Sequence, residues 1–288
     1  MSRALTFSLT LLAMIAFAGN SLLCRLALKH SSIDAASFTT IRIVSGALAL
    51  WLILRLRAGT HTATGSWPSA LALFAYAGGF SYAYVSLPAA AGALLLFGAV
   101  QATMIGYGLW AGERLTMRQS TGLLLAFGGL AILLFPGLSA PPVPGSLLML
   151  GAGVAWGIYS LRGKGAGDPI CATAGNFLRA TPMAAALSVV MLPWSSLDAL
   201  DALDGVGVCY AIASGALASG LGYAVWYTAL RGLKATSAAS VQLSVPIIAA
   251  VGGIVFLGET ISVRLVIASA AILGGIALVI VGKQADRR

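Results

Sequence analysis

Charged residues are scarce in this sequence. Only 9% of its residues are Asp, Glu, Lys or Arg, whereas 59% are hydrophobic; a soluble domain has roughly 25% charged residues. Most of the surface therefore cannot face water, and the composition predicts a protein that crosses the lipid bilayer many times. The formal charge of +9 would suggest nucleic acid in a soluble protein. Here the Lys and Arg residues stand in short connectors, where they set topology, so we expect no nucleic-acid partner.

Residues that could carry chemistry are equally few. The three cysteines lie in or beside apolar segments without CxxC spacing, which predicts small buried side chains rather than disulfides. His30 and His61 stand near connectors and far apart, so neither a metal site nor a serine nucleophile with its base is indicated. No Asp or Glu lies inside an apolar run, which leaves a carboxylate proton relay without a candidate. We therefore expect neither an enzyme nor a cofactor.

Ten apolar runs approach the roughly 20 residues that a membrane helix needs. They are 4–23, 35–54, 67–87, 89–110, 117–135, 145–161, 170–192, 205–230, 235–257 and 263–281. The first run also resembles a cleavable signal peptide, but it has its own counterpart in the second half of the chain. One connector is rich in helix breakers, 136–144, and it follows the fifth run.

An internal repeat of about half the chain organises the sequence. Gly112-Glu113 precedes the fifth run and Gly258-Glu259 precedes the tenth, so the two glutamates lie 146 positions apart (113 to 259). Five helices in each half, an odd number, bring the second half into the membrane from the opposite side. We expect an all-α integral membrane protein of ten transmembrane helices in two inverted repeats. Its units are a first repeat at 1–136, an external linker at 137–144 and a second repeat at 145–288.

The positions of Lys and Arg predict the orientation. With the N-terminus inside, the cytoplasmic segments hold most of these residues, while the external loops hold only Lys29 and Arg264, with Arg25 near the outer end of the first helix. We therefore expect both termini in the cytoplasm and the protein in the inner, cytoplasmic membrane.

Several motifs resemble those of the drug/metabolite transporter superfamily, in its EamA-type branch of ten-helix, two-repeat carriers. They are the two Gly-Glu pairs, Trp156-Gly157, Arg42 with Arg179, and Ser244-Val245-Pro246, and the resemblance covers nearly the whole chain. Within the branch the sequence is most similar to the YddG-type exporters of aromatic and other neutral amino acids. The resemblance implies a basket of helices around a central cavity, lined by the first, third, fourth, sixth, eighth and ninth helices.

The ninth and fourth runs hold polar and flexible positions. Pro246 lies about twelve residues into the ninth run, so it should kink the helix and free the carbonyl of Gln242. Such a carbonyl is tolerated beside a wet cavity, to which Ser244 would add polarity, or beside a neighbouring serine in a purely structural role. In the fourth run, Gln101 lines the cavity or joins helices. The predicted hinges are Gly92, Gly98 and Pro246.

Aromatic residues gather on the third and eighth runs: Tyr76, Phe80, Tyr82 and Tyr84, then Tyr223, Trp226 and Tyr227. The second group has i, i+3, i+4 spacing and shares one helical face, which could stack an apolar side chain or form an interfacial belt. Matched positions of the first and sixth runs add further candidates. The predicted substrate site is Phe17, Asn20, Tyr82, Gln101, Trp156, Tyr159, Tyr223, Trp226, Gln242, Ser244 and Pro246.

Charged residues near or within the runs have two readings each. Arg42 and Arg179 lie eight or nine residues inside their runs. They either snorkel and clamp carbonyls, the interpretation we favour, or bind a substrate carboxylate. Glu113 and Glu259 fit dipole-complementing helix starts better than coupling groups.

The function that follows is export of small neutral metabolites, above all aromatic and other apolar amino acids, by alternating access without proton coupling. A drug or other metabolite exporter of the same superfamily, or a passive metabolite channel, stays open. The predicted partners are small-molecule substrates and the lipid bilayer, and a monomer is compatible with the sequence.

Overall fold

The structure is a computed structural model that describes residues 2–57, 62–112, 114–137, 140–163, 167–194, 204–233, 238 and 241–285. In this part of the chain all regular elements are helical, without a strand. Seven helices are long and apolar enough to cross a membrane, which confirms the membrane class. They are α1 (Arg3–His30), α2 (Ala35–Leu56), α4 (Ala89–Trp110), α5 (Met117–Leu134), α6 (Val143–Gly163), the continuous stretch Gly205–Leu230, and α12 (Val263–Ala285).

The remaining helices are less apolar or shorter. They are α3 (Trp67–Tyr84), α7 (Pro169–Met191), the 3-10 turn η1 (Leu192–Trp194) and α11 (Ser244–Leu257). The expected continuous helix at 235–257 is not what the structure describes: α11 begins after a turn at Leu243, and residues 234–237 and 239–240 lie outside the described part. Residues 241–242 are helical directly before this turn, and Pro246 stands in the first turn of α11, where its missing N–H costs no hydrogen bond. The helix is thus interrupted next to Pro246, where the kink was expected.

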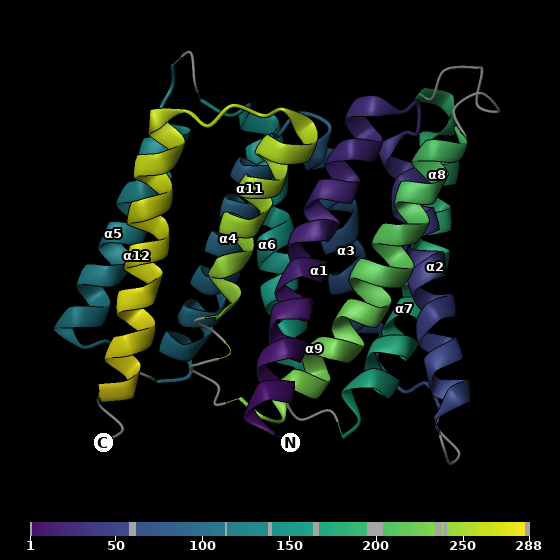
Figure 1. The fold of residues 1–288 in the computed structure, drawn as a ribbon, viewed down its shortest axis with the longest axis horizontal. Coiled ribbons are helices and arrows are strands. Elements are labelled where there is room, and N and C mark those ends of the chain that lie inside the picture. The colour runs from purple at the N-terminus through teal and green to yellow at the C-terminus, as the bar shows by residue number, and fades with distance from the viewer. Residues whose placement is uncertain are drawn as a thin grey trace.

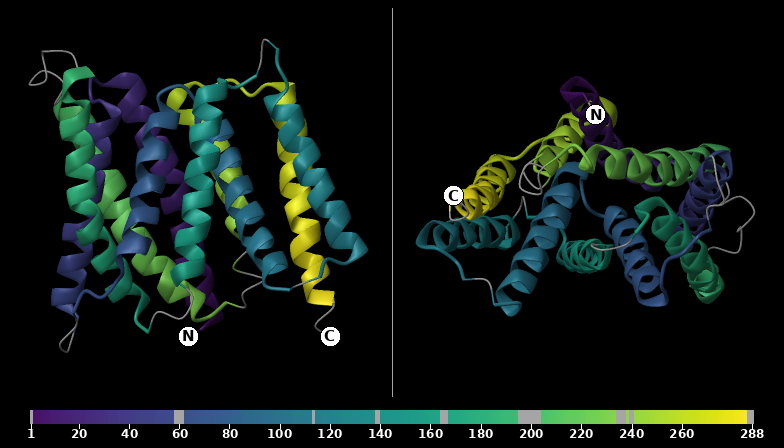
Figure 2. Two further views of the ribbon diagram at one scale, coloured as in Figure 1. Left: turned by 180° about the vertical axis from the view of Figure 1, so that it is seen from behind. Right: turned by 90° about the horizontal axis from the view of Figure 1, so that it is seen from below.

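The helices form two facing rows when the bundle is viewed along its helices (Figure 2). One row contains α12, α11, α1, the stretch 205–230 and α2; the other contains α5, α4, α6, α3 and α7. α5 packs against α12 at one end of the rows and α2 packs against α7 at the other. The start of α1 and the end of α12 lie on the same side of the bundle (Figure 1).

Glycine lets neighbouring helices approach closely. A Cβ on Gly122 of α5 would lie 2.6 Å from the carbonyl oxygen of Gly275 in α12, and a Cβ on Gly153 of α6 would lie 2.6 Å from that of Leu96 in α4. Such contacts replace the hydrophobic driving force, which is missing between helices in lipid. The neighbouring Gly274 has open space where its Cβ would be.

The stretch 205–230 is not a regular α-helix. It consists of α8 (Gly205–Ile212), the π-helical segment η2 (Ala213–Leu221) and α9 (Gly222–Leu230). Within η2, a Cβ on Gly215 would collide with the backbone of Arg42 in α2. The π-helix thus lies where the two helices meet most closely, and π-helical turns are frequent at functional sites.

Candidate substrate site

Aromatic rings from four helices meet in the middle of the bundle. The centroid of the Trp156 ring lies 4.8 Å from that of Tyr76, 5.1 Å from Tyr223 and 5.2 Å from Tyr159. Phe17 of α1 contacts Tyr223 edge-on, with 5.9 Å between ring centroids, and it also lies 5.9 Å from the ring of Trp226. The structure thus brings together five predicted site residues, Phe17, Trp156, Tyr159, Tyr223 and Trp226. We call these five residues with Tyr76 the aromatic cluster.

A polar strip runs along one side of this cluster. Asn20 of α1 donates its Nδ2–H to the hydroxyl of Tyr76 at 3.2 Å and accepts a hydrogen bond from Ser214 at 2.6 Å. The Tyr76 hydroxyl also accepts from Nη2 of Arg42 at 3.0 Å. Asn20 and Tyr76 are 5% and 4% exposed. The strip therefore offers buried hydrogen-bonding groups next to stacked rings, a combination suited to a small amphipathic ligand.

Arg42 lies fully inside the bundle, with 2% of its surface exposed. Its Nε donates to Ser219 of η2 at 3.4 Å, and its guanidinium carbon lies 4.8 Å from the Phe80 ring centroid and 5.1 Å from that of Tyr76. The expectation that this arginine snorkels towards an interface or clamps carbonyls is wrong, because its guanidinium donates to side chains in the core, those of Ser219 and Tyr76. Two rings and two hydroxyls hold the cation there instead.

Arg179 in α7 occupies the matching place in the second half but has different surroundings. It is half-buried and donates to the carbonyl of Gly175 at 3.0 Å and to that of Thr64. For this arginine the carbonyl-clamp interpretation agrees with the structure. The two arginines matched in the sequence thus differ in role.

A small cavity lies against the aromatic cluster. It has room for only about 20 Å³, which is space for about one water molecule. An amino acid would therefore fit only after the helices or side chains move apart. The cavity is lined by Phe17, Asn20, Tyr76, Phe80, Leu96, Phe97, Trp156, Ala218 and Tyr223.

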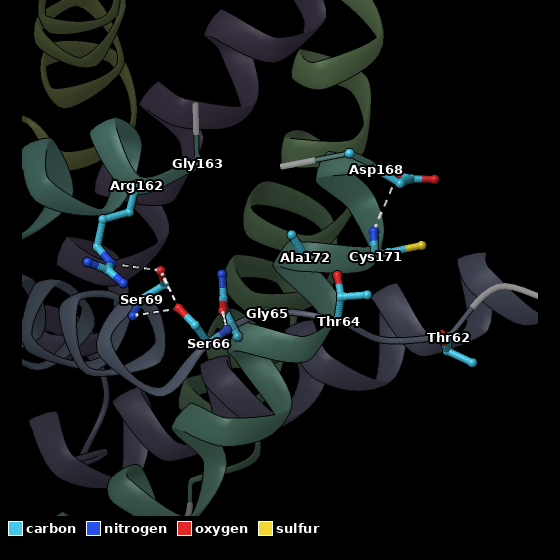
Figure 3. Close-up of a pocket in the computed structure, with 12 residues that line it drawn as sticks. Thr62, Thr64, Gly65, Ser66, Ser69, Arg162, Gly163, Asp168, Cys171 and Ala172 are labelled. Atoms are coloured by element: carbon cyan, nitrogen blue, oxygen red, sulfur yellow. Dashed lines mark hydrogen bonds between the residues drawn. The ribbon is translucent and has the colours of Figure 1, made fainter. Parts of the chain in front are cut away.

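A much larger hollow of about 530 Å³ lies between the starts of α3 and α7 and the end of α6 (Figure 3). This is the end of the bundle where α1 begins (Figure 1). We call this hollow the vestibule; it is lined by Thr62, Thr64, Gly65, Ser66, Ser69, Arg162, Gly163, Gly167, Asp168, Cys171, Ala172 and Asn176. Arg162 donates to Ser69 at 3.1 Å on its wall. Asn176 donates to the Tyr159 hydroxyl at 3.4 Å, and Tyr159 stacks on Trp156. These two rings stand between the vestibule and the central cavity.

An ion pair joins the helices at the opposite end. Nε of Arg25 lies 3.3 Å from Glu259, and Nη1 donates to the carbonyls of Tyr84 at 2.9 Å and Val85 at 3.0 Å. The second carboxylate oxygen of Glu259 accepts from the backbone N–H of Ala89, at the start of α4, at 2.8 Å. Glu259 thus complements a helix start, as predicted, but the helix is α4 rather than α12, which it precedes in the chain. Glu113 lies outside the described residues.

Other predicted residues lie away from the cluster or at its edge. Tyr82 is half-buried within electrostatic range of Asp34. Gln101 is buried in α4. Gln242 and Ser244 are half-buried around the turn before α11, where the Ser244 hydroxyl donates to the carbonyl of Val241 at 2.6 Å. None of these four residues lines the cavity described above.

Both glycines predicted as hinges are packed. Gly92 faces the ring of Tyr84, and a Cβ on Gly98 would meet Ile272 of α12 at 3.7 Å. The predicted substrate site lacked Tyr76, Phe80 and Arg42, which the sequence analysis considered without choosing, and Ser214 and Ser219, which it did not consider. Tyr76 and Phe80 have i, i+4 spacing, so their shared helical face was a signal for them.

Comparison with known proteins shows that about half of the chain is similar to transporters. Residues 143–281 match the EamA-like transporter family. The protein PA1977 of Pseudomonas aeruginosa, which is uncharacterized, is 58% identical over 276 residues, or 96% of this chain and 94% of that protein. The threonine/homoserine exporter RhtA is 31% identical in Salmonella typhimurium and 32% identical in Escherichia coli over 157 residues. That match spans 52% of this chain and about half of the exporter, 50%.

A solved crystal structure shares the fold. It superimposes with a TM-score of 0.63 over 96% of this chain and 98% of its own, at 19% sequence identity. The second half of the chain is thus similar to the EamA-like transporter family.

Proposed function

We propose that the protein exports small neutral metabolites, above all aromatic and other apolar amino acids. The family match of its second half and the RhtA relatives support a multi-pass inner-membrane transporter of small molecules rather than an enzyme. The amino-acid proposal rests on one observation: the aromatic cluster lies beside the buried amide and hydroxyls of Asn20, Tyr76 and Ser214. Rings can stack an apolar side chain while the polar groups bind the backbone of the amino acid.

We also propose that the chain is built as ten transmembrane helices in two inverted repeats, 1–136 and 145–288, joined by the linker 137–144. The packing supports this, because exchanging the halves exchanges the two rows in Figure 2. For example, α3 packs along α6 as the stretch 205–230 packs along α1, and α4 packs along α6 as α11 packs along α1. Both termini would then be cytoplasmic. All groups of the site come from one chain, so a monomer suffices.

The transport mechanism that we propose is alternating access to the central cavity from the two sides of the membrane. The Arg25–Glu259 ion pair holds the external end closed, and the vestibule receives substrate from the cytoplasm. Substrate then passes Tyr159 and Trp156 into the central cavity, while Gly92, Gly98 and Pro246 allow the helices to move. Because the helices of the described part contain no acidic residue, exchange proceeds without proton coupling.

Small hydroxylated amino acids are a second candidate class. The observation that favours them is the similarity to the threonine/homoserine exporters over half of the chain. The hydroxyl and amide groups of the polar strip would also bind such a side chain. Threonine and tryptophan in one assay separate the two classes.

The experiment is counterflow of labelled tryptophan, phenylalanine, methionine and threonine in proteoliposomes. Trp156→Ala should raise the half-saturating tryptophan concentration about 2- to 13-fold, because loss of a stacked ring costs about 0.5–1.5 kcal/mol. Leu124→Ala is the matched control, since this side chain is 73% exposed on α5. Equal exchange in wild type, Trp156→Ala and Leu124→Ala would contradict the proposed site, and flux that does not saturate would support a channel.

A further inference from the structure

Arg42 is a buried cation for which the described residues provide no counter-ion. The ion pairs in this part of the structure are Arg25–Glu259 and Arg57–Asp168. The titratable groups around the guanidinium of Arg42 are the hydroxyls of Tyr76 and Tyr223 and the thiol of Cys24, which are uncharged groups. A buried charge without an opposite charge is costly and marks a functional site by default.

The hydrogen bonds of Arg42 leave one donor free. Its Nη1 is buried without a hydrogen-bond partner in the described part of the chain. Nη2 donates to the Tyr76 hydroxyl at 3.0 Å, and this same oxygen accepts from Asn20 Nδ2 at 3.2 Å. Two strong donors therefore converge on one weak, neutral acceptor, with a third donor beside them. A carboxylate has two oxygens that accept such a fork of donors far better than a phenol does.

We propose that Arg42 and Asn20 form the carboxylate subsite of this transporter, a role that rests on the proposed export of amino acids. The ligand carboxylate displaces the Tyr76 hydroxyl: one oxygen takes the donors of Arg42 Nη2 and Asn20, and the other takes Nη1. The negative charge of the ligand then compensates the buried guanidinium. Asn20 and Tyr76 line the central cavity, so the remainder of the ligand lies against the aromatic cluster.

This subsite predicts an unusual order of specificity. The described helices contain no acidic side chain that could pair with an ammonium group. Recognition therefore depends on the carboxylate more than on the amine. Aromatic monocarboxylates without an amino group should compete with amino acids, whereas the corresponding amides should not. Three-phenylpropanoate and phenylalaninamide are suitable probes, because each lacks one of the two charged groups of phenylalanine.

The test measures competition by both probes against phenylalanine counterflow in wild type and variants. In wild type, phenylalaninamide should compete about 10- to 100-fold more weakly than 3-phenylpropanoate, the factor for a hydrogen bond to a charged group. Arg42→Gln should abolish this difference. Tyr76→Phe should keep it, because the phenol competes with the carboxylate for the same donors. Arg179→Gln is the matched control and should also keep it, since that arginine binds backbone carbonyls.

A second variant covers the case in which Arg42→Gln does not fold. Asn20→Asp places a carboxylate beside Arg42, so it should raise the thermal stability of the protein and abolish competition by 3-phenylpropanoate. Equal competition by both probes in wild type, an unchanged ratio in Arg42→Gln, or loss of the difference in Tyr76→Phe would each overturn the proposal. Thermal stabilisation by 3-phenylpropanoate distinguishes a failure of the carboxylate subsite from a failure of the proposed export function. Stabilisation without any amino-acid exchange contradicts the export function, and exchange without stabilisation contradicts the subsite.

Discussion

The contact between Arg25 and Glu259 permits a quantitative prediction about the closed end of the bundle. The two charged atoms are 3.3 Å apart and the side chains are only 13% and 11% exposed. At an effective dielectric constant of about 20, this distance corresponds to roughly 5 kcal/mol of Coulomb attraction. Desolvation removes much of it. We therefore expect a coupling free energy of about 1–3 kcal/mol between Arg25 and Glu259.

The assay is a double-mutant cycle of Arg25→Gln and Glu259→Gln, read from the free energy of unfolding in denaturing detergent. The corresponding cycle for Arg57 and Asp168 is the control. Those side chains are 30% and 28% exposed, so their coupling should stay below about 1 kcal/mol. A coupling free energy near zero for Arg25 and Glu259 would refute the reasoning, because the ion pair would then contribute nothing to closure.

Opening of this end should also be visible at a native thiol. Cys24 lies next to Arg25 in α1 and its side chain is fully buried. In a background without Cys171 and Cys209, Glu259→Gln should increase the rate of Cys24 labelling by a thiol reagent about 5- to 150-fold, the factor that corresponds to 1–3 kcal/mol. An unchanged labelling rate would mean that the ion pair does not hold the closed state.

Two further predictions concern helix packing and pH. Gly275→Ala should destabilise the protein by about 1–3 kcal/mol, because its Cβ would collide with the backbone of Gly122, whereas Gly274→Ala, in open space, should stabilise it by about 0.5–1 kcal/mol. Burial raises the pKa of Asp168, whereas hydrogen bonds from backbone amides and Arg57 lower it. The lowering effects together outweigh burial, so the pKa of Asp168 lies below its usual value. The stabilisation of the fold by ionised Asp168 is thus present above about pH 4 and is lost as the pH falls. Between about pH 5 and pH 3, the thermal unfolding temperature of the wild type should therefore fall by more than that of Asp168→Asn.

The helices could be predicted from the sequence because lipid requires long apolar runs. The range 89–110 agrees with α4 residue for residue. The first helix is longer than expected and ends at His30 rather than 23. Its last turns contain Arg25 and Lys29, which are poor residues for a membrane span. Tertiary contacts keep them helical, since Lys29 donates to the carbonyl of Leu257 at 3.4 Å and Arg25 pairs with Glu259.

The site was predictable only in part, because the repeat locates positions and does not give their environments. Phe17, Asn20 and Trp156 were found from matched places in the two halves, and the structure brings them to one cavity. The same logic paired Arg42 with Arg179, which differ in the structure. The difference depends on the close approach of Gly215 to α2 and on the π-helical turn around it. The small-residue spacing of Gly215 and Ser219 is compatible with a close approach but does not say which helix lies against it, and the π-helical turn has no local sequence signal.

The central claim is that this chain carries amino acids through a saturable site without using protons. The most direct measurement is the concentration dependence of labelled tryptophan counterflow in proteoliposomes, with and without a pH gradient. We expect saturable exchange that the gradient leaves unchanged. Exchange that occurs only with the gradient, or flux that rises linearly with tryptophan concentration, would contradict the claim.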